Sequence, residues 1–237
     1  TEGRVVVEPR AAAVGTPAQQ AEMVRDGLVD VSLIIPGYSP GRFPLLELGE
    51  LGLTSDEIAK SAPAMATIYE KYFEEIGVFD GAHALSVFNV APAQLATRDR
   101  PVVDGAVFPY EPTVSFGLQD VFKFFTDVPG GLGQAGTALL VNQEKWDTIS
   151  PEDQEAIMAI SGAVLARQVG EAVDAGAARS KQILEDGGAT IETASPELIA
   201  ALEEQLEPVY AAWVEKAKTA GLENAEEVLA EYREMVK

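Results

Sequence analysis

The chain has 237 residues, of which 47% are hydrophobic, so it can build one large domain or two modest ones. Thirty-eight acidic residues against seventeen basic ones give a net charge of −21 at pH 7. A phosphate backbone or an anionic membrane surface would repel such a chain, which argues against nucleic acid as a partner. Because cysteine is absent and His83 is the one histidine, we expect no metal, no cofactor and no histidine- or thiol-based catalysis.

No apolar run approaches the roughly 20 residues needed to cross a bilayer, so we expect a soluble chain. The first elements in chain order are a β-branched run at 5–7 and a helix that starts with Thr16 as N-cap and Pro17 at the first helical position. A strand over 29–35 follows and ends at Pro36. This strand–helix–strand order is typical of an α/β fold.

Further elements continue the alternation until about residue 142. The pattern predicts a helix over 55–76, and strands at 84–89, 104–109, 137–142 and 190–193. Ser195 starts a late helix that ends near Gly221, and a last amphipathic helix covers 225–236.

The most distinctive element is a helix that begins at Ser150-Pro151, with two acidic residues on the positive end of the helix dipole. No strong breaker follows before Gly187-Gly188. A continuous helix of this length would measure about 50 Å, so we expect it to lie across two lobes. Its apolar stripe (Ile157, Ile160, Val164) fits either a core or a partner protein.

The loop over 36–44 follows a strand directly, and ligands of α/β proteins bind beyond the carboxyl ends of strands. Three prolines and two glycines shape the loop, which presents Tyr38, Arg42 and Phe43. Arg42 would offer bidentate hydrogen bonds to an anion. The alternative is a stiff surface loop in which Arg42 pairs with Glu47 or Glu50.

A second cluster covers 104–111, where Phe108 and Tyr110 flank a proline. They would line a pocket, or pack in the core as aromatic residues on strands commonly do. Upstream, Gln94, Arg98 and Arg100 would orient a carboxylate or form an ordinary polar linker. The glycine-rich stretch 130–136 lacks the lysine of a phosphate-binding loop, so we predict a flexible connection there.

Taken in order, several segments resemble the solute-binding proteins of TRAP transporters, the DctP-like family. They are 15–35 with Val24-Arg25-Asp26-Gly27, the loop 36–44, Val103-Asp104-Gly105-Ala106-Val107, and 141–147 followed by Ser150-Pro151-Glu152-Asp153-Gln154. Measured against this family, the chain starts after the first strand and helix. It also lacks a central segment after Pro101, which carries the arginine that clamps the ligand carboxylate. Arg98 and Arg100 precede that position and do not replace it.

The resemblance implies a two-lobed periplasmic binding protein-like α/β fold with a long helix spanning both lobes. Lobe I would comprise 1–91 and 136–175, and lobe II 92–135 and 176–237. The protein would be periplasmic and not an enzyme. It would close on a small organic acid and deliver it to a membrane permease, as a monomer or as a homodimer through the long helix. A helical partner-binding or structural protein and a binding-incompetent fragment are the alternatives.

Overall fold

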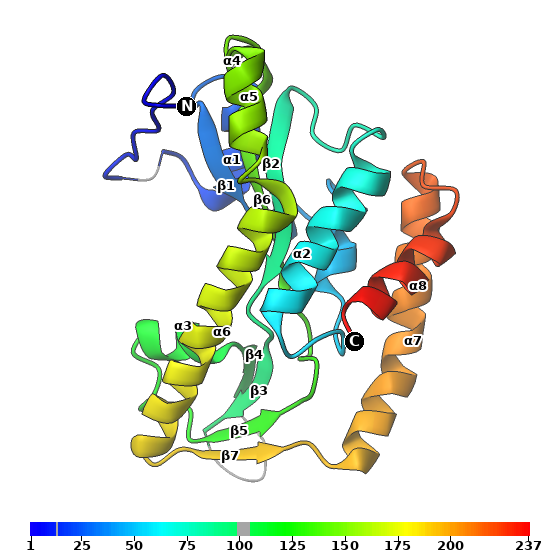
Figure 1. Ribbon diagram of the computed structural model, residues 1–237. Helices are drawn as coiled ribbons and strands as arrows, with labels where there is room; N and C mark the ends of the chain where they lie inside the picture. The colour runs from blue at the N-terminus through cyan, green and yellow to red at the C-terminus, as the bar shows by residue number, and fades with distance from the viewer. Residues whose placement is uncertain (13, 99–104) are drawn as a thin grey trace.

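The computed structural model describes residues 1–12, 14–98 and 105–237, which form two β-sheets with helices packed around them (Figure 1). The first sheet has the strand order β1 (Val31–Ile34), β6 (Ala135–Asn142), β2 (Ala82–Val90). The second has the order β4 (Gly105–Phe108), β3 (Gln94–Thr97), β5 (Phe124–Asp127), β7 (Thr190–Thr193). The α-helices are α1 (Gln20–Arg25), α2 (Ile58–Ile68), α3 (Tyr110–Ser115), α4 (Gln143–Asp147), α5 (Pro151–Met158), α6 (Gly162–Asp186), α7 (Pro196–Thr219) and α8 (Ala225–Met235).

Strand direction places the carboxyl ends of most strands between the two sheets. In the first sheet β6 is antiparallel to both neighbours, so β1 and β2 run the same way. In the second sheet β3 is antiparallel to β4 and β5, and β7 is parallel to β5. The chain passes directly from β2 into β3 and from β5 into β6. The parallel strands of each sheet, β1 with β2 and β5 with β7, therefore run toward the other sheet. This two-lobed α/β arrangement confirms the predicted fold class.

The glycine-rich stretch between β5 and β6 is a tightly packed crossover, so the prediction of a flexible connection was wrong. Gly131 accepts a hydrogen bond from the Leu53 amide at 2.8 Å, and Leu132 N–H donates to Ala93 O at 2.8 Å. A Cβ atom at Gly131 would lie 2.8 Å from the Pro92 side chain. Glycine is therefore needed there for close approach of two backbones, in addition to its positive φ of 69°.

The predicted long helix is broken into α5 and α6. Ser161 adopts an extended conformation and Gly162 has a φ of 53°, so neither residue continues the helix. The Gly162 carbonyl accepts a hydrogen bond from the buried Ser86 hydroxyl at 2.8 Å, which fixes the break against β2. The 25 residues of α6 alone span about 37 Å.

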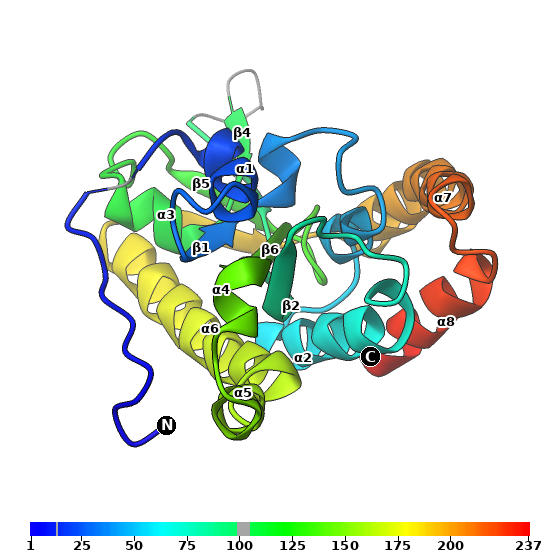
Figure 2. The same cartoon turned by 90° about the horizontal axis from the view of Figure 1, so that it is seen from above.

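The α6 helix spans both lobes, as predicted (Figures 1 and 2). Its first half packs against α2 through Ala166 and Val169, and Leu184 near its end joins Phe125 in the core of the second sheet. Ile160 and Val164 of the predicted stripe are exposed, so a homodimer through this helix stays a prediction.

By length and composition alone, Pro151–Asp186 qualifies as a candidate membrane span among the described residues. The expectation that no segment reaches that length was therefore too strict. The break at 159–161 and the packing of α6 on α2 are those of a helix in a folded domain.

The largest core lies on the first sheet and includes α7 and α8. Tyr210, Trp213 and Tyr232 are at most 5% exposed and pack with residues such as Leu45 and Phe73. The sequence placed all of 176–237 in the second lobe, whereas 210–236 lies with the first sheet because its apolar face completes that core. We propose a division that moves this segment to the first lobe.

Two glycines of α6 give a direct test of its packing. A Cβ atom at Gly170 would lie 2.5 Å from the Ile58 carbonyl oxygen, whereas the nearest neighbour of one at Gly176 would be Glu111 Cγ, at 3.7 Å. We expect Gly170→Ala to lower the free energy of unfolding by about 1–3 kcal/mol. Gly176→Ala should raise it by about 0.5–1 kcal/mol, because alanine favours helix. Urea unfolding measures both, and shifts in the same direction would contradict this account of the α2–α6 contact.

Candidate functional site

A cavity of about 350 Å³ lies at the carboxyl ends of β4, β5 and β7, where the second sheet faces the first lobe. We call it the interlobe pocket. Its walls come from the crossover segments, from α6 and from the start of α3. The residues are Asp56, Pro92, Gln94, Tyr110, Asp127, Pro129, Ala177, Ala178, Lys181 and Thr193. Ligands of α/β sheets bind at this position, and the volume is at the small end of ligand pockets.

An ion pair crosses one wall of the interlobe pocket. Lys181 Nζ of α6 lies 2.6 Å from Asp127 Oδ2 at the end of β5. The Lys181 ammonium also lies 5.7 Å from the centre of the Tyr110 ring. Both charged side chains remain partly accessible, at 37% and 28% exposure. A ligand in the pocket can therefore reach them without disrupting the core.

Tyr110 brings a buried hydrogen-bonding group to the same wall. The residue is 7% exposed, and its ring packs 5.5 Å from that of Phe125. Its hydroxyl makes no hydrogen bond within 3.5 Å, although it lies near enough to the Asp127 carboxylate to interact with it. Burial, together with the nearby Asp127 carboxylate, raises the pKa of this hydroxyl. It therefore stays protonated at neutral pH and keeps its capacity to donate a hydrogen bond.

Gln94 lines the pocket, but its amide is already engaged. Its Nε2 donates to Val128 O at 3.3 Å, and Val128 N–H donates to its Oε1 at 2.6 Å. Asp56 likewise accepts a hydrogen bond from Gly130 N–H at 2.5 Å. These two side chains hold the crossover in place, and their remaining surface faces the pocket.

Phe108 is partly buried and lies opposite Gln94 in the β3–β4 register, so both side chains are on the same face of the second sheet. Its ring contacts Phe116 at 6.2 Å. Arg98 is exposed and follows the end of β3 that is remote from the pocket. Arg100, and the position after Pro101 where the family carries further residues, lie outside the described residues.

The loop 36–44 lies elsewhere. Tyr38 is 54% exposed, and Phe43 is buried in the first core, 5.6 Å from Phe79, where it also borders a cavity of about 120 Å³. Arg42 contacts the Phe43 ring and pairs with Glu22 at 3.5 Å, rather than with Glu47 or Glu50. The structure therefore does not bring these three residues together with Gln94 and Tyr110.

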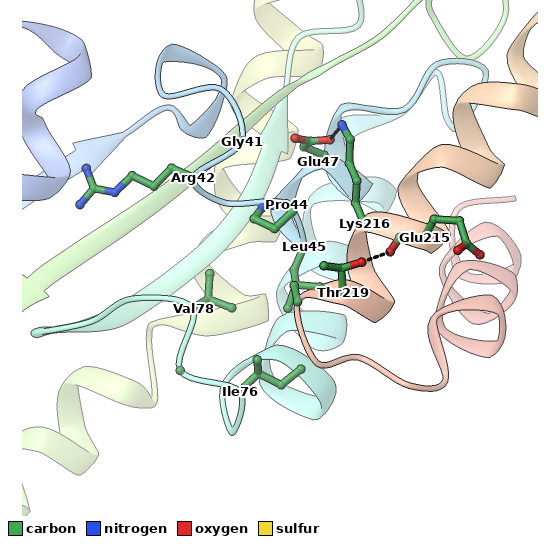
Figure 3. Close-up of a pocket in the computed structure, with 12 residues that line it drawn as sticks. Gly41, Arg42, Pro44, Leu45, Glu47, Ile76, Val78, Glu215, Lys216 and Thr219 are labelled. Atoms are coloured by element: carbon green, nitrogen blue, oxygen red, sulfur yellow. Dashed lines mark hydrogen bonds and ion pairs between the residues drawn. The ribbon is translucent and has the colours of Figure 1, made fainter.

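A larger open pocket of about 730 Å³ lies on the first lobe, between the loop at 41–47, the turn at 76–78 and the end of α7 (Figure 3). Lys216 pairs with Glu47 at 2.6 Å across it, and Arg42 points away from this pair. None of its lining residues comes from the second sheet. It is therefore a surface feature of one lobe.

His83 lines none of the three pockets described above. Its ring stacks on Trp146 at 4.3 Å, and its Nε2 lies 3.5 Å from Met158 Sδ. Burial lowers its pKa, against a smaller opposite effect of Glu74 and Asp147. This is a packed structural histidine rather than an acid–base catalyst.

Of the residues that line the interlobe pocket, the sequence indicated Gln94 and Tyr110 but not Lys181, Asp127 and Asp56. Lys181 and Asp127 are 54 positions apart, and neither lies in a segment with a recognisable binding motif. The lysine sits beside the small residues Ala177 and Ala178 on one helix face. A lysine beside two alanines on one helix face was the feature of the sequence that could have indicated a pocket-lining position.

The chain belongs to the bacterial extracellular solute-binding proteins of family 7 (DctP), which match residues 82–217. It resembles a TRAP periplasmic solute-binding protein from Bordetella bronchiseptica with bound (R)- and (S)-mandelate, at 28% identity and a TM-score of 0.91 over 99% of this chain and 89% of that one. A TRAP solute-binding protein from Rhodoferax ferrireducens with copurified benzoate gives 21% and 0.82, over 94% of this chain and 83% of that one.

A further relative is the outer membrane transporter protein TsaT of Comamonas testosteroni. It is 23% identical, over 98% of this chain and 82% of TsaT. The family and its solved members are transport binding proteins, which confirms both the predicted resemblance and the prediction that the chain is not an enzyme.

Two buried tyrosines test the unpartnered hydroxyl. We expect Tyr110→Phe to leave the free energy of unfolding unchanged or to raise it by up to about 1 kcal/mol, because it removes a buried polar group without a partner. Tyr210 is the matched control, since its hydroxyl donates to Gly52 O at 2.7 Å. Tyr210→Phe should cost about 1 kcal/mol. Equal losses in urea unfolding would show that the Tyr110 hydroxyl is bonded in solution.

The lowered pKa of His83 predicts a stability change in mild acid. The unfolded chain takes up this proton near pH 6.5, and the folded chain only at lower pH. The contribution of neutral His83 is thus complete above pH 6.5 and is lost as the pH falls through the folded pKa. The difference in unfolding free energy between the wild type and His83→Gln should shrink from pH 7.5 to pH 5.5. A constant or growing difference would contradict the assignment.

Proposed function

We propose that the protein is the extracytoplasmic solute-binding component of a TRAP-type transporter and that it holds a small organic acid in the interlobe pocket. The observation that carries the proposal is the placement of Lys181 and Tyr110 on one wall of a cavity between two lobes. An ammonium group and a protonated phenol are both donors, and a carboxylate is an acceptor. Membership of an extracellular solute-binding family supports a periplasmic location.

The apolar walls indicate the size and nature of the rest of the ligand. Pro92, Pro129 and two alanines of α6 line the pocket beside the Tyr110 ring. A cavity of about 350 Å³ accommodates a short aliphatic acid or an acid with one ring. A structurally similar protein that is 28% identical to this chain holds mandelate, an acid of the second kind, and we propose this class for the present chain.

Binding would act through closure of the two lobes. A ligand that contacts Lys181 and Asp127 on one side and the crossover at Pro92 and Pro129 on the other favours the state in which both contacts exist. The closed form would then be delivered to membrane permease subunits. Tyr38, Arg42, Phe43 and Phe108, which the sequence placed at the ligand, stay predictions whose contribution would require movement of the loop 36–44 or of the lobes.

A thermal-shift panel of acids tests the proposal. An acid present at 100 times its Kd should stabilise the native chain by about 2.7 kcal/mol, which corresponds to about 5–10 °C in Tm for a chain of this size. Mandelate, benzoate, orotate and pyroglutamate form a suitable first panel.

Lys181→Met keeps the aliphatic stem but removes the ammonium, and we expect it to abolish the shift. Lys123→Met is the matched control, because Lys123 is a partly exposed lysine just before β5, at the strand end remote from the pocket. No shift with any acid, or an equal loss in both variants, would refute acid binding in the interlobe pocket.

A further inference from the structure

The charges that face the interlobe pocket do not suit a plain carboxylate. Asp127, Asp56 and Lys181 line it, so acidic groups outnumber basic ones. Asp56 is engaged with the Gly130 amide, whereas Asp127 shares the wall with Lys181 at 2.6 Å. An acid that reaches the Lys181 ammonium must therefore place its carboxylate close to the carboxylate of Asp127.

Two like charges on one ammonium repel each other unless a donor lies between them. An ionised aspartate accepts hydrogen bonds at both oxygens, and Lys181 contacts Oδ2. A hydroxyl or ammonium group on the ligand, next to its carboxylate, would donate to Asp127 and remove the conflict.

Tyr110 completes the pattern. Its hydroxyl is buried, makes no hydrogen bond within 3.5 Å and lies on the same wall as the ion pair, near Asp127. The wall thus presents two donors, Lys181 and Tyr110, beside one acceptor, Asp127. The complementary ligand has a carboxylate as acceptor and a donor on the adjacent carbon.

On the basis of the proposed function, we infer that the pocket selects 2-hydroxy or 2-amino acids over acids without that group, and that Asp127 is the residue that discriminates between them. The apolar side of the pocket, formed by Pro92, Pro129 and Ala177, would hold the remainder of the ligand.

Matched pairs of acids test this inference by isothermal titration calorimetry on the full chain. Mandelate and phenylacetate differ only in the 2-hydroxyl, and so do 3-phenyllactate and 3-phenylpropionate. We expect the hydroxy acid of a pair to bind about tenfold or more tightly, as a hydrogen bond to a charged group provides.

Asp127→Asn should narrow the difference between the two members of a pair. The plain acid should bind more tightly, because repulsion is removed, whereas the hydroxy acid exchanges a charged acceptor for a weaker neutral one and gains less, so that their ratio falls below about threefold. Asp120→Asn is the control, since its side chain is 90% exposed and Asp120 does not line the pocket. It makes the same charge change and should leave the ratio intact.

The outcomes separate the inference from the proposed function. Equal affinities in the wild type, or an undiminished ratio in Asp127→Asn, would overturn the role of Asp127 while acid binding stands. If no member of any pair binds the wild type, acid binding itself fails and the inference fails with it.

Discussion

The relation between the two lobes depends on how α6 is fixed to each of them. The Asp174 carboxylate of α6 accepts hydrogen bonds from the Ile58 and Ala59 amides, both at 2.9 Å, and so caps the start of α2 in the first lobe. Two turns later the same helix pairs with Asp127 of the second sheet through Lys181. One helix therefore carries a polar anchor to each lobe, and the residues between the anchors line the interlobe pocket.

This arrangement explains why small residues occupy that part of α6. Ala177 and Ala178 border the pocket, and Gly176 faces Glu111 with ordinary spacing. Larger side chains here would fill the cavity, whereas at Gly170 they would push α2 away. The small residues therefore have two separate causes. Gly170 is needed for close packing against α2, and Ala177 and Ala178 leave the cavity open.

Local rules predicted the elements that have local causes. Ser150 and Ser195 accept hydrogen bonds from the amides three residues later, as their helix-start patterns indicated. The four-residue strands β3 and β5 were missed, because they are short and their burial follows contacts with distant strands. The helix break at Gly162 is held by a hydrogen bond from Ser86 of β2, and the buried position of Phe43 depends on its contact with Phe79. Neither feature could be predicted from the residues of its own segment. The same holds for the Asp127–Lys181 pair.

The proposed site would allow an acidic protein to hold an acid. About half of the net charge of −21 lies on the α-helices, and salt at physiological strength screens exposed charges beyond about 8 Å. Groups inside that distance decide the affinity. Lys181 pairs with Asp127 and is therefore only partly available, and the Tyr110 hydroxyl lies near the same carboxylate. In the proposed complex, the charge that a ligand meets would be set by the balance between Lys181 and Asp127, and a donor group on the ligand would offset the charge of Asp127.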